Sequence, residues 1–142
     1  MPRTMSEDAD SPSVIISDRQ SVPADHDALA DLARRTLLEE GAGPVELSVS
    51  LVDLQEMTQL HVQYSKEEGP TDVLSFTMDE DGLLGDVVIC PEFAKSQSQD
   101  LDAELRLLLV HGILHLLGYD HREDAERVAM WQRQEQYSGV RL

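Results

Sequence analysis

Apolar residues recur along this chain with two different spacings, which predict a mixture of helices and strands. Residues 23–40 place apolar side chains at helical intervals and end at Gly41, so we expect a helix there. Residues 45–52 alternate apolar and polar positions, which predicts a half-buried strand. The short apolar run at 14–16 predicts an earlier strand. The first third of the chain is therefore expected to run strand, helix, strand.

A further helix and a pair of strands are expected next. Asp53 is well placed to cap the helix, and Glu56 stands where a capping box requires a glutamate. Residues 73–78 and 86–90 predict two strands, joined by a turn at 79–82. The second strand is almost continuously apolar, so we expect it to be covered on both faces.

Three helices are expected in the remainder of the chain. Pro91 can open a short helix at its first turn. A longer apolar helix is predicted from about residue 101 to residue 117, and a last one from about 122 to 137. The last helix is expected to pack three apolar side chains against the core, namely Val128, Met130 and Trp131.

The candidate chemistry lies at the end of the longer helix. His111 and His115 are four residues apart, so they share one helix face. Gly118 follows where a helix can end in a left-handed turn, and His121 can then approach the pair from another direction. Three neutral imidazoles with a vacant fourth position are typical of a catalytic zinc site rather than a structural one.

The spacing of these residues matches the ligand frame of metzincin proteases, with one departure. Position 112 is glycine, where those proteases carry the glutamate that takes a proton from the metal-bound water. Without it, the reaction must depend on the metal's lowering of the pKa of water, on a base from elsewhere, or on the substrate. A phosphodiester can supply charged oxygens, whereas a peptide offers much less. The sequence therefore favours a phosphodiesterase over a protease.

Three blocks of this sequence resemble those of the YbeY family of bacterial endoribonucleases and ribosomal RNA maturation factors. Residues 111–121 are similar to its signature H-G-x-L-H-L-x-G-Y-D-H. Residues 69–76 resemble its P-T-[DN]-V-L-S-F block, and residues 84–91 resemble its L-G-D-[IV]-x-[IL] strand. The resemblance covers about residues 14 to 138, with the blocks in family order.

The resemblance implies an α+β fold in which one small mixed sheet of four strands packs with about five helices in a single hydrolase-like domain. It implies one zinc ion per chain, held by His111, His115 and His121. It also implies cleavage of single-stranded RNA, linked to maturation of the 16S rRNA 3′ end and to quality control of ribosomes. The implied partners are the 16S rRNA precursor and the ribosome or its proteins.

Other positions in or near the matching blocks have alternative roles. Many family members carry an arginine that is thought to face the metal cleft, whereas this chain has Ser65 at that position. Asp120 could orient the imidazole of a ligand or cap the last helix. Three polar residues could face the substrate or brace the motif: Thr71, Asp72 and Ser75.

Composition suits one cytoplasmic domain. The 142 residues can form a single domain, expected over 13–142, behind an acidic tail at 1–12 that we expect to be disordered. Cys90 is the single cysteine, which allows no internal disulfide and fits a reducing compartment. No apolar run approaches the ~20 residues that span a membrane, and the N-terminus lacks the apolar region of a signal peptide.

The net charge is unusual for a protein that binds RNA. It is −17, from 28 acidic and 11 basic residues, so the surface as a whole repels RNA at long range. Either a locally basic cleft and a docking partner such as the ribosome compensate, or RNA is not the substrate. The cationic groupings, which we expect to be mostly solvated or paired with carboxylates, are Arg34, Arg35, Arg106, Arg122, Arg127 and Arg133.

Three classes of function remain open from sequence. The first is a zinc-dependent endoribonuclease. The second is a zinc hydrolase that acts on a peptide or a small phosphoester. The third is a ribosome-associated assembly factor with a structural zinc, which a fourth protein ligand, Asp120 or Asp72, would favour. The sequence also leaves open whether water or the ribose 2′-hydroxyl is the nucleophile.

Overall fold

The structure is a computed structural model that describes residues 11–65, 71–119 and 124–140. The described residues form four strands and five helices: β1 (Ser13–Arg19), α2 (His26–Glu39), β2 (Glu46–Val52), α3 (Leu54–Ser65), β3 (Val73–Glu80), β4 (Leu83–Ile89), α4 (Pro91–Gln97), α5 (Leu101–Leu116) and α6 (Asp124–Ser138). This is the α+β architecture that the sequence predicts.

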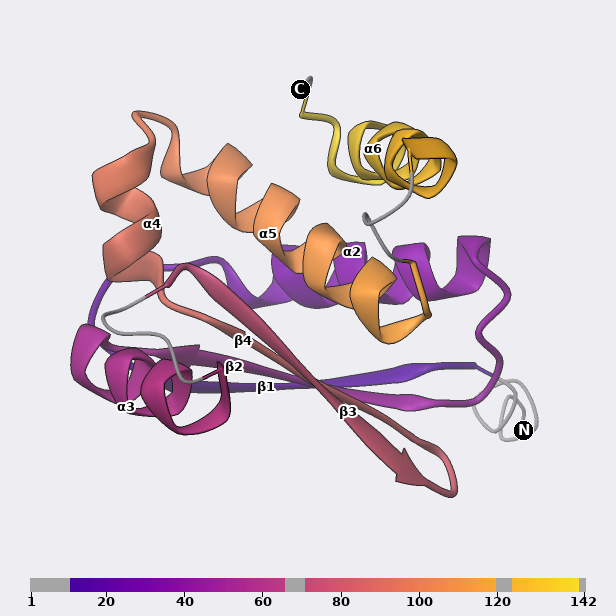
Figure 1. The fold of residues 1–142 in the computed structure, drawn as a ribbon, viewed down its shortest axis with the longest axis horizontal. Helices are drawn as coiled ribbons and strands as arrows, with labels where there is room; N and C mark the ends of the chain where they lie inside the picture. Colours follow the sequence, from indigo (N-terminus) through magenta and orange to yellow (C-terminus); the bar gives the residue numbers. More distant parts are fainter. Residues whose placement is uncertain (1–10, 66–70, 120–123, 141–142) are drawn as a thin grey trace.

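The four strands form one mixed sheet in the order β1-β2-β4-β3 (Figure 1). The first three of these strands are parallel, and β3 pairs antiparallel with β4 at the edge. The turn between β3 and β4 is shorter than predicted, because Glu80 pairs with Leu83 and only residues 81 and 82 remain outside the strands. Gly82 has a φ of 76°, which suits glycine in a tight turn.

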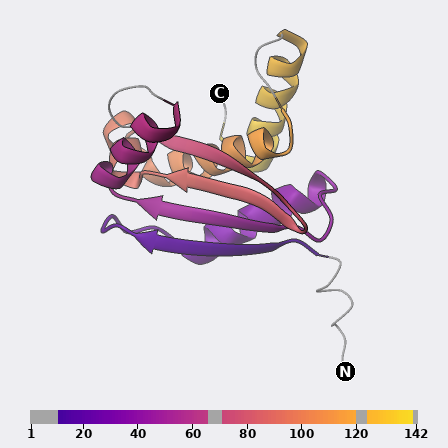
Figure 2. The same cartoon turned by 60° about the horizontal axis from the view of Figure 1, so that its bottom comes forward.

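Helices cover both faces of the sheet. In Figures 1 and 2, α2 and α5 lie on one face with α6 beyond them, and α3 lies on the other. The larger core lies under α2 and α5 and includes Leu47, Val49, Val87 and Ile89 of the sheet. A smaller core forms around Met57 of α3. The prediction that the apolar strand β4 is covered on both faces is confirmed, because these two cores lie on opposite sides of it.

Helix α5 packs closely against the sheet. Gly112 faces β4, and a Cβ atom placed there would lie 2.6 Å from Cγ1 of Val87. The carbonyl oxygen of Gly112 accepts a hydrogen bond from Oγ of Ser75 in β3 at 3.1 Å. A Cβ atom at Gly85 would lie 2.8 Å from Cδ2 of Leu116, so glycine permits a second close approach. Although α5 is largely apolar, no helix in the described ranges is long and apolar enough to cross a membrane.

The helix caps agree with the sequence in part. Asp53 caps α3, because its Oδ1 accepts a hydrogen bond from the backbone nitrogen of Glu56 at 2.8 Å. The predicted capping box is wrong in its other half, since the Glu56 carboxylate accepts hydrogen bonds from Arg19 instead. Helix α2 begins later than predicted, at His26, because Asp25 caps it by accepting a hydrogen bond from Ala28.

Helix α6 packs against the rest of the protein with a different face from the predicted one. Met130 is 1% exposed, but Val128 and Trp131 are 49% and 52% exposed, so their predicted packing is wrong. The buried positions besides Met130 are polar, namely Gln134 and Ser138. Met130, Gln134 and Ser138 are spaced by four residues, which places them on one helix face.

A buried carboxylate ties α6 to α2 and to the end of α5. Glu40, which follows α2, accepts hydrogen bonds from the hydroxyl groups of Tyr119 (2.7 Å) and Tyr137. Nε of Arg133 lies 3.5 Å from the Glu40 carboxylate and donates a hydrogen bond to the Tyr119 hydroxyl. Burial, together with the hydrogen bond and the charge of Glu40, raises the pKa of Tyr137 to about 12.

Gly112→Ala is expected to destabilise the protein. Overpacking a core costs about 1–3 kcal/mol, which outweighs the ~1 kcal/mol that alanine gains over glycine in helix propensity. Urea denaturation should therefore give a free energy of unfolding lower by up to about 2 kcal/mol. Val87→Ala removes Cγ1 and Cγ2, two of the three atoms that the new methyl group would meet, and leaves Oγ of Ser75. In the Val87→Ala background, Gly112→Ala should lower the free energy of unfolding by less than it does in the wild type. If the effects of the two substitutions simply add, this account of the packing is contradicted.

The raised pKa of Tyr137 predicts that the protein loses stability at alkaline pH. Its pKa in the folded state is about 12, against ~10 in an unfolded chain. The unfolded state therefore ionises first, and the stabilising contribution is complete below pH ~10 and is lost toward pH ~12. Denaturation at several pH values should show this loss in the wild type and not in Tyr137→Phe. Parallel curves for the two proteins would argue against it.

Candidate metal centre

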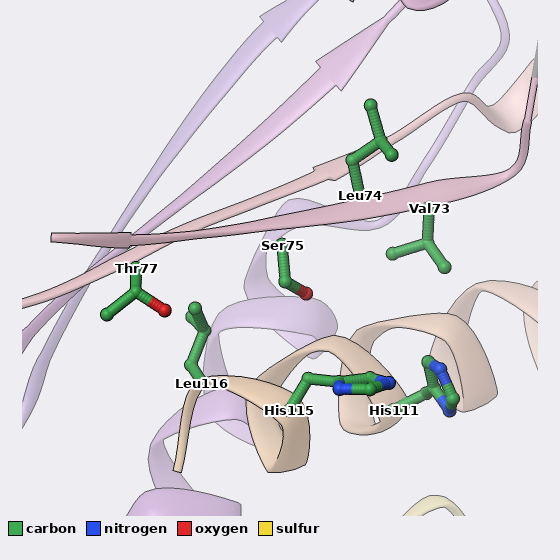
Figure 3. A pocket seen from close by; sticks show the side chains of 7 residues that line it. All are labelled: Val73, Leu74, Ser75, Thr77, His111, His115 and Leu116. Atoms are coloured by element: carbon green, nitrogen blue, oxygen red, sulfur yellow. The ribbon is translucent and has the colours of Figure 1, made fainter. Parts of the chain in front are cut away.

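Helix α5 places two histidine side chains side by side. His111 and His115 lie one turn apart on its half-buried face, with ring centroids 4.7 Å apart and ring planes at 74° (Figure 3). Their spacing follows from the helical repeat, and the close packing of α5 on the sheet turns this face toward β3. The predicted helix end is also observed, because Gly118 has a φ of 103°.

The arrangement of the two rings fits a shared metal ion. Two imidazoles that bind one tetrahedral zinc ion through bonds of about 2.1 Å have ring centroids roughly 5 Å apart. The observed distance of 4.7 Å is close to this value. Neutral imidazole nitrogens are also the donors that zinc, nickel and copper favour.

Helix α6 supplies a hydrogen-bond partner for one of these histidines. Nδ1 of His111 lies 2.6 Å from Oε1 of Gln134, whose side chain is buried. An amide oxygen only accepts hydrogen bonds, so this contact requires the tautomer in which Nδ1 carries the proton and donates it. This fixes Nε2 as the nitrogen that can bind a metal.

The histidines line a surface cavity of about 310 Å³. Its other wall is β3, where Val73, Ser75 and Thr77 point toward α5 and Leu74 points away (Figure 3). This alternation follows from the strand, in which successive side chains face opposite sides. The cavity is thus walled by a helix that carries imidazoles and by an edge strand that carries hydroxyl groups.

The predicted site residues are placed as follows. Ser75 lines the cavity and donates a hydrogen bond to the carbonyl of Gly112, the residue that directly follows His111. Thr71 and Asp72 precede β3 and are not among the described residues that line this cavity. His121 and Asp120 lie outside the described residues. Accordingly, within the described ranges no three His, Cys, Asp or Glu side chains form a cluster that could hold a metal.

The missing glutamate at position 112 has a structural explanation. A side chain there would enter the contact between α5 and Val87 of β4, so the packing of the helix leaves room only for glycine. The carboxylate nearest along this helix face is Glu104, two turns before His111. Burial, and then the negative charge of Asp72, raise the pKa of Glu104.

Asp86 is a half-buried carboxylate that belongs to the opposite face of the sheet. It lines a separate cleft with Glu56 and Tyr64 of α3. Burial raises its pKa, although Ser50 and Ser48 donate hydrogen bonds to it. Its neighbours Gly85 and Val87 face α5, so strand alternation directs Asp86 away from the histidines.

Most of the arginines that the structure describes are paired with carboxylates, as expected. Arg34 pairs with Asp31 at 3.1 Å, Arg106 pairs with Asp102, and Arg133 pairs with Glu40. Arg122 lies outside the described residues, as does the side chain of Ser65, the position of the family arginine. These three paired arginines therefore offer little uncommitted charge to an RNA backbone.

Sequence reasoning missed Gln134. It offered Asp120, which is near the motif in sequence, either for orienting a ligand or for capping the last helix, whereas Gln134 reaches His111 from 23 residues away. One signal was available. Gln134 stands four residues after Met130, where the helical repeat of α6 requires a core residue, and a polar side chain at such a position needs a partner.

The chain is similar to known proteins along most of its length. The family model described as "Endoribonuclease YbeY" matches residues 15–139. A curated relative named "Endoribonuclease YbeY" from Streptomyces griseus is 44% identical, covering 84% of this chain and 84% of the relative. A relative of the same name from Thermobifida fusca is 46% identical, and the match covers 86% of this chain and 89% of the relative.

A solved structure agrees with these sequence matches. The solution structure of TM1509 from Thermotoga maritima matches this fold with a TM-score of 0.60 at 30% identity, covering 88% of this chain and 86% of that one. The resemblance in three short motifs thus extends to the sequence and fold of nearly the whole chain. The chain belongs to the YbeY endoribonuclease family.

Proposed function

We propose that this protein is a zinc-dependent endoribonuclease that cleaves single-stranded RNA during maturation of the 16S rRNA 3′ end. The observation that carries the proposal is the pair His111 and His115, held side by side at a cavity that an edge strand lines with hydroxyl groups. Family membership supports RNA as the substrate, because the matching relatives are named as endoribonucleases.

His111, His115 and His121 would hold the zinc ion. The first two present a geometry suited to one ion, and the third follows the helix end at Gly118 by three residues. When bound, zinc would supply positive charge that stabilises the pentacoordinate phosphorane formed during cleavage. The candidate set contains imidazoles alone, which leaves a coordination position for the substrate.

The other residues of the site would orient and shield the reacting groups. Gln134 lies within hydrogen-bond distance of the His111 ring and would hold it in one orientation. Ser75 holds α5 against β3 through its bond to Gly112, so the cavity walls keep their spacing. Val73 and Leu116 add apolar surface, which limits the water around the scissile phosphate.

The acidic surface argues for a docking partner. With a net charge of −17 and most described arginines paired, long-range attraction of RNA is weak. We therefore assign to the ribosome, through its rRNA or its basic proteins, the task of bringing precursor RNA to this site. The cysteine usage noted above supports a cytoplasmic location, where ribosomes are assembled.

The test compares cleavage of a single-stranded RNA that spans a 16S rRNA 3′ end by the wild type, His111→Ala and His115→Ala. Each protein is stripped with a chelator and then assayed with and without added zinc. Several kcal/mol of transition-state stabilisation by a metal corresponds to about 100-fold or more in rate. We expect both variants, and the wild type without metal, to lose at least that much activity.

The control is His26→Ala, which removes an exposed histidine of α2 that pairs with Asp18. It should cleave like the wild type, whereas equal cleavage by all four proteins would indicate a contaminating ribonuclease. The product ends report the nucleophile: a 2′,3′-cyclic phosphate indicates the ribose 2′-hydroxyl, and a 5′-phosphate indicates water. A zinc-loaded wild type that cleaves no RNA would contradict the proposal and favour an assembly factor.

A further inference from the structure

We propose that Gln134 of α6 is a positioning residue for the metal centre, and that its amide oxygen sets the tautomer in which His111 binds the ion. The inference rests on the proposed metal site and adds to it a residue far away in sequence. Gln134 touches neither substrate nor metal in this role. It acts through the imidazole of His111.

The contact has the features of a fixed hydrogen bond. Oε1 of Gln134 lies 2.6 Å from Nδ1 of His111, and Gln134 is only 5% exposed. Water therefore competes poorly for the Gln134 amide, and a half-buried imidazole N–H that lost this acceptor would be left without it at a cost in free energy. Its bond to Gln134 thus holds the proton on Nδ1 and directs the lone pair of Nε2 into the site.

Two sets of contacts fix the rotation of α6, so that Gln134 faces α5. At the C-terminal end of α6, Nε of Arg106 in α5 donates to the carbonyl of Ser138 at 3.0 Å. On the side facing α2, Tyr137 and Arg133 both contact the carboxylate of Glu40. These contacts flank position 134, which is why its side chain is presented to His111 and not to solvent.

The chemistry of the acceptor makes a specific prediction. A glutamine amide accepts the Nδ1 proton without adding charge, whereas a carboxylate at the same place would raise the basicity of the imidazole. Leucine has a similar size and no acceptor. Gln134→Glu should therefore bind zinc as tightly as the wild type or more tightly. Gln134→Leu should bind zinc most weakly of the three proteins.

The experiment measures the zinc dissociation constant of each purified full-length variant by competition with a chromophoric chelator. We expect Gln134→Leu to bind zinc about 10–100-fold more weakly, the range found when partners of ligand histidines are removed. Gln132→Leu is the matched control, since Gln132 is exposed on the same helix, and it should bind like the wild type. In His111→Ala, adding Gln134→Leu should change nothing further.

A second readout is independent of whether the leucine variant folds. Long-range proton–nitrogen NMR of the zinc-free wild type should show His111 protonated at Nδ1. Protonation at Nε2, or an unchanged zinc affinity in Gln134→Leu beside a clear loss in His111→Ala, would overturn this inference alone. Wild-type zinc affinity in both His111→Ala and His115→Ala would overturn the metal site itself, and the inference with it.

Discussion

The close contact between α5 and the sheet determines where the candidate metal centre lies. Only glycine fits at position 112, because its Cα faces the side chain of Val87. With the helix that near, Ser75 of β3 reaches its backbone. His111 and His115 therefore come to lie beside the edge strand, at a cavity that both elements line. Larger side chains at this contact would move the imidazoles away from β3.

The same contact explains how this protein differs from proteases with similar histidine spacing. A glutamate after the first histidine would have to occupy the space that Val87 fills. The proposed site would consequently depend on imidazoles, on hydroxyl groups of β3 and on Gln134. Such a set suits a substrate that brings its own negative oxygens, which is the case for a phosphodiester and not for a peptide.

Patterns of local origin could be predicted from the sequence, and contacts between distant elements could not. The helical spacing of His111 and His115 and the turn at Gly118 follow from residues within one or two helical turns. The bond from Gln134 to His111 depends on how α6 docks on α5, which no local pattern encodes. The exposure of Trp131 has the same origin, since docking by a polar face left this apolar side chain outside.

The most direct test of this account is a crystal structure of the zinc-loaded protein with anomalous data collected at the zinc absorption edge. The account predicts one ion per chain at about 2.0–2.1 Å from imidazole nitrogens, with Nε2 of His111 and a ring nitrogen of His115 among its ligands and His121 as the third. Nδ1 of His111 should remain bonded to Gln134, and a position beside β3 should stay open to the cavity. An ion bound elsewhere, or one enclosed by four protein ligands, would contradict it.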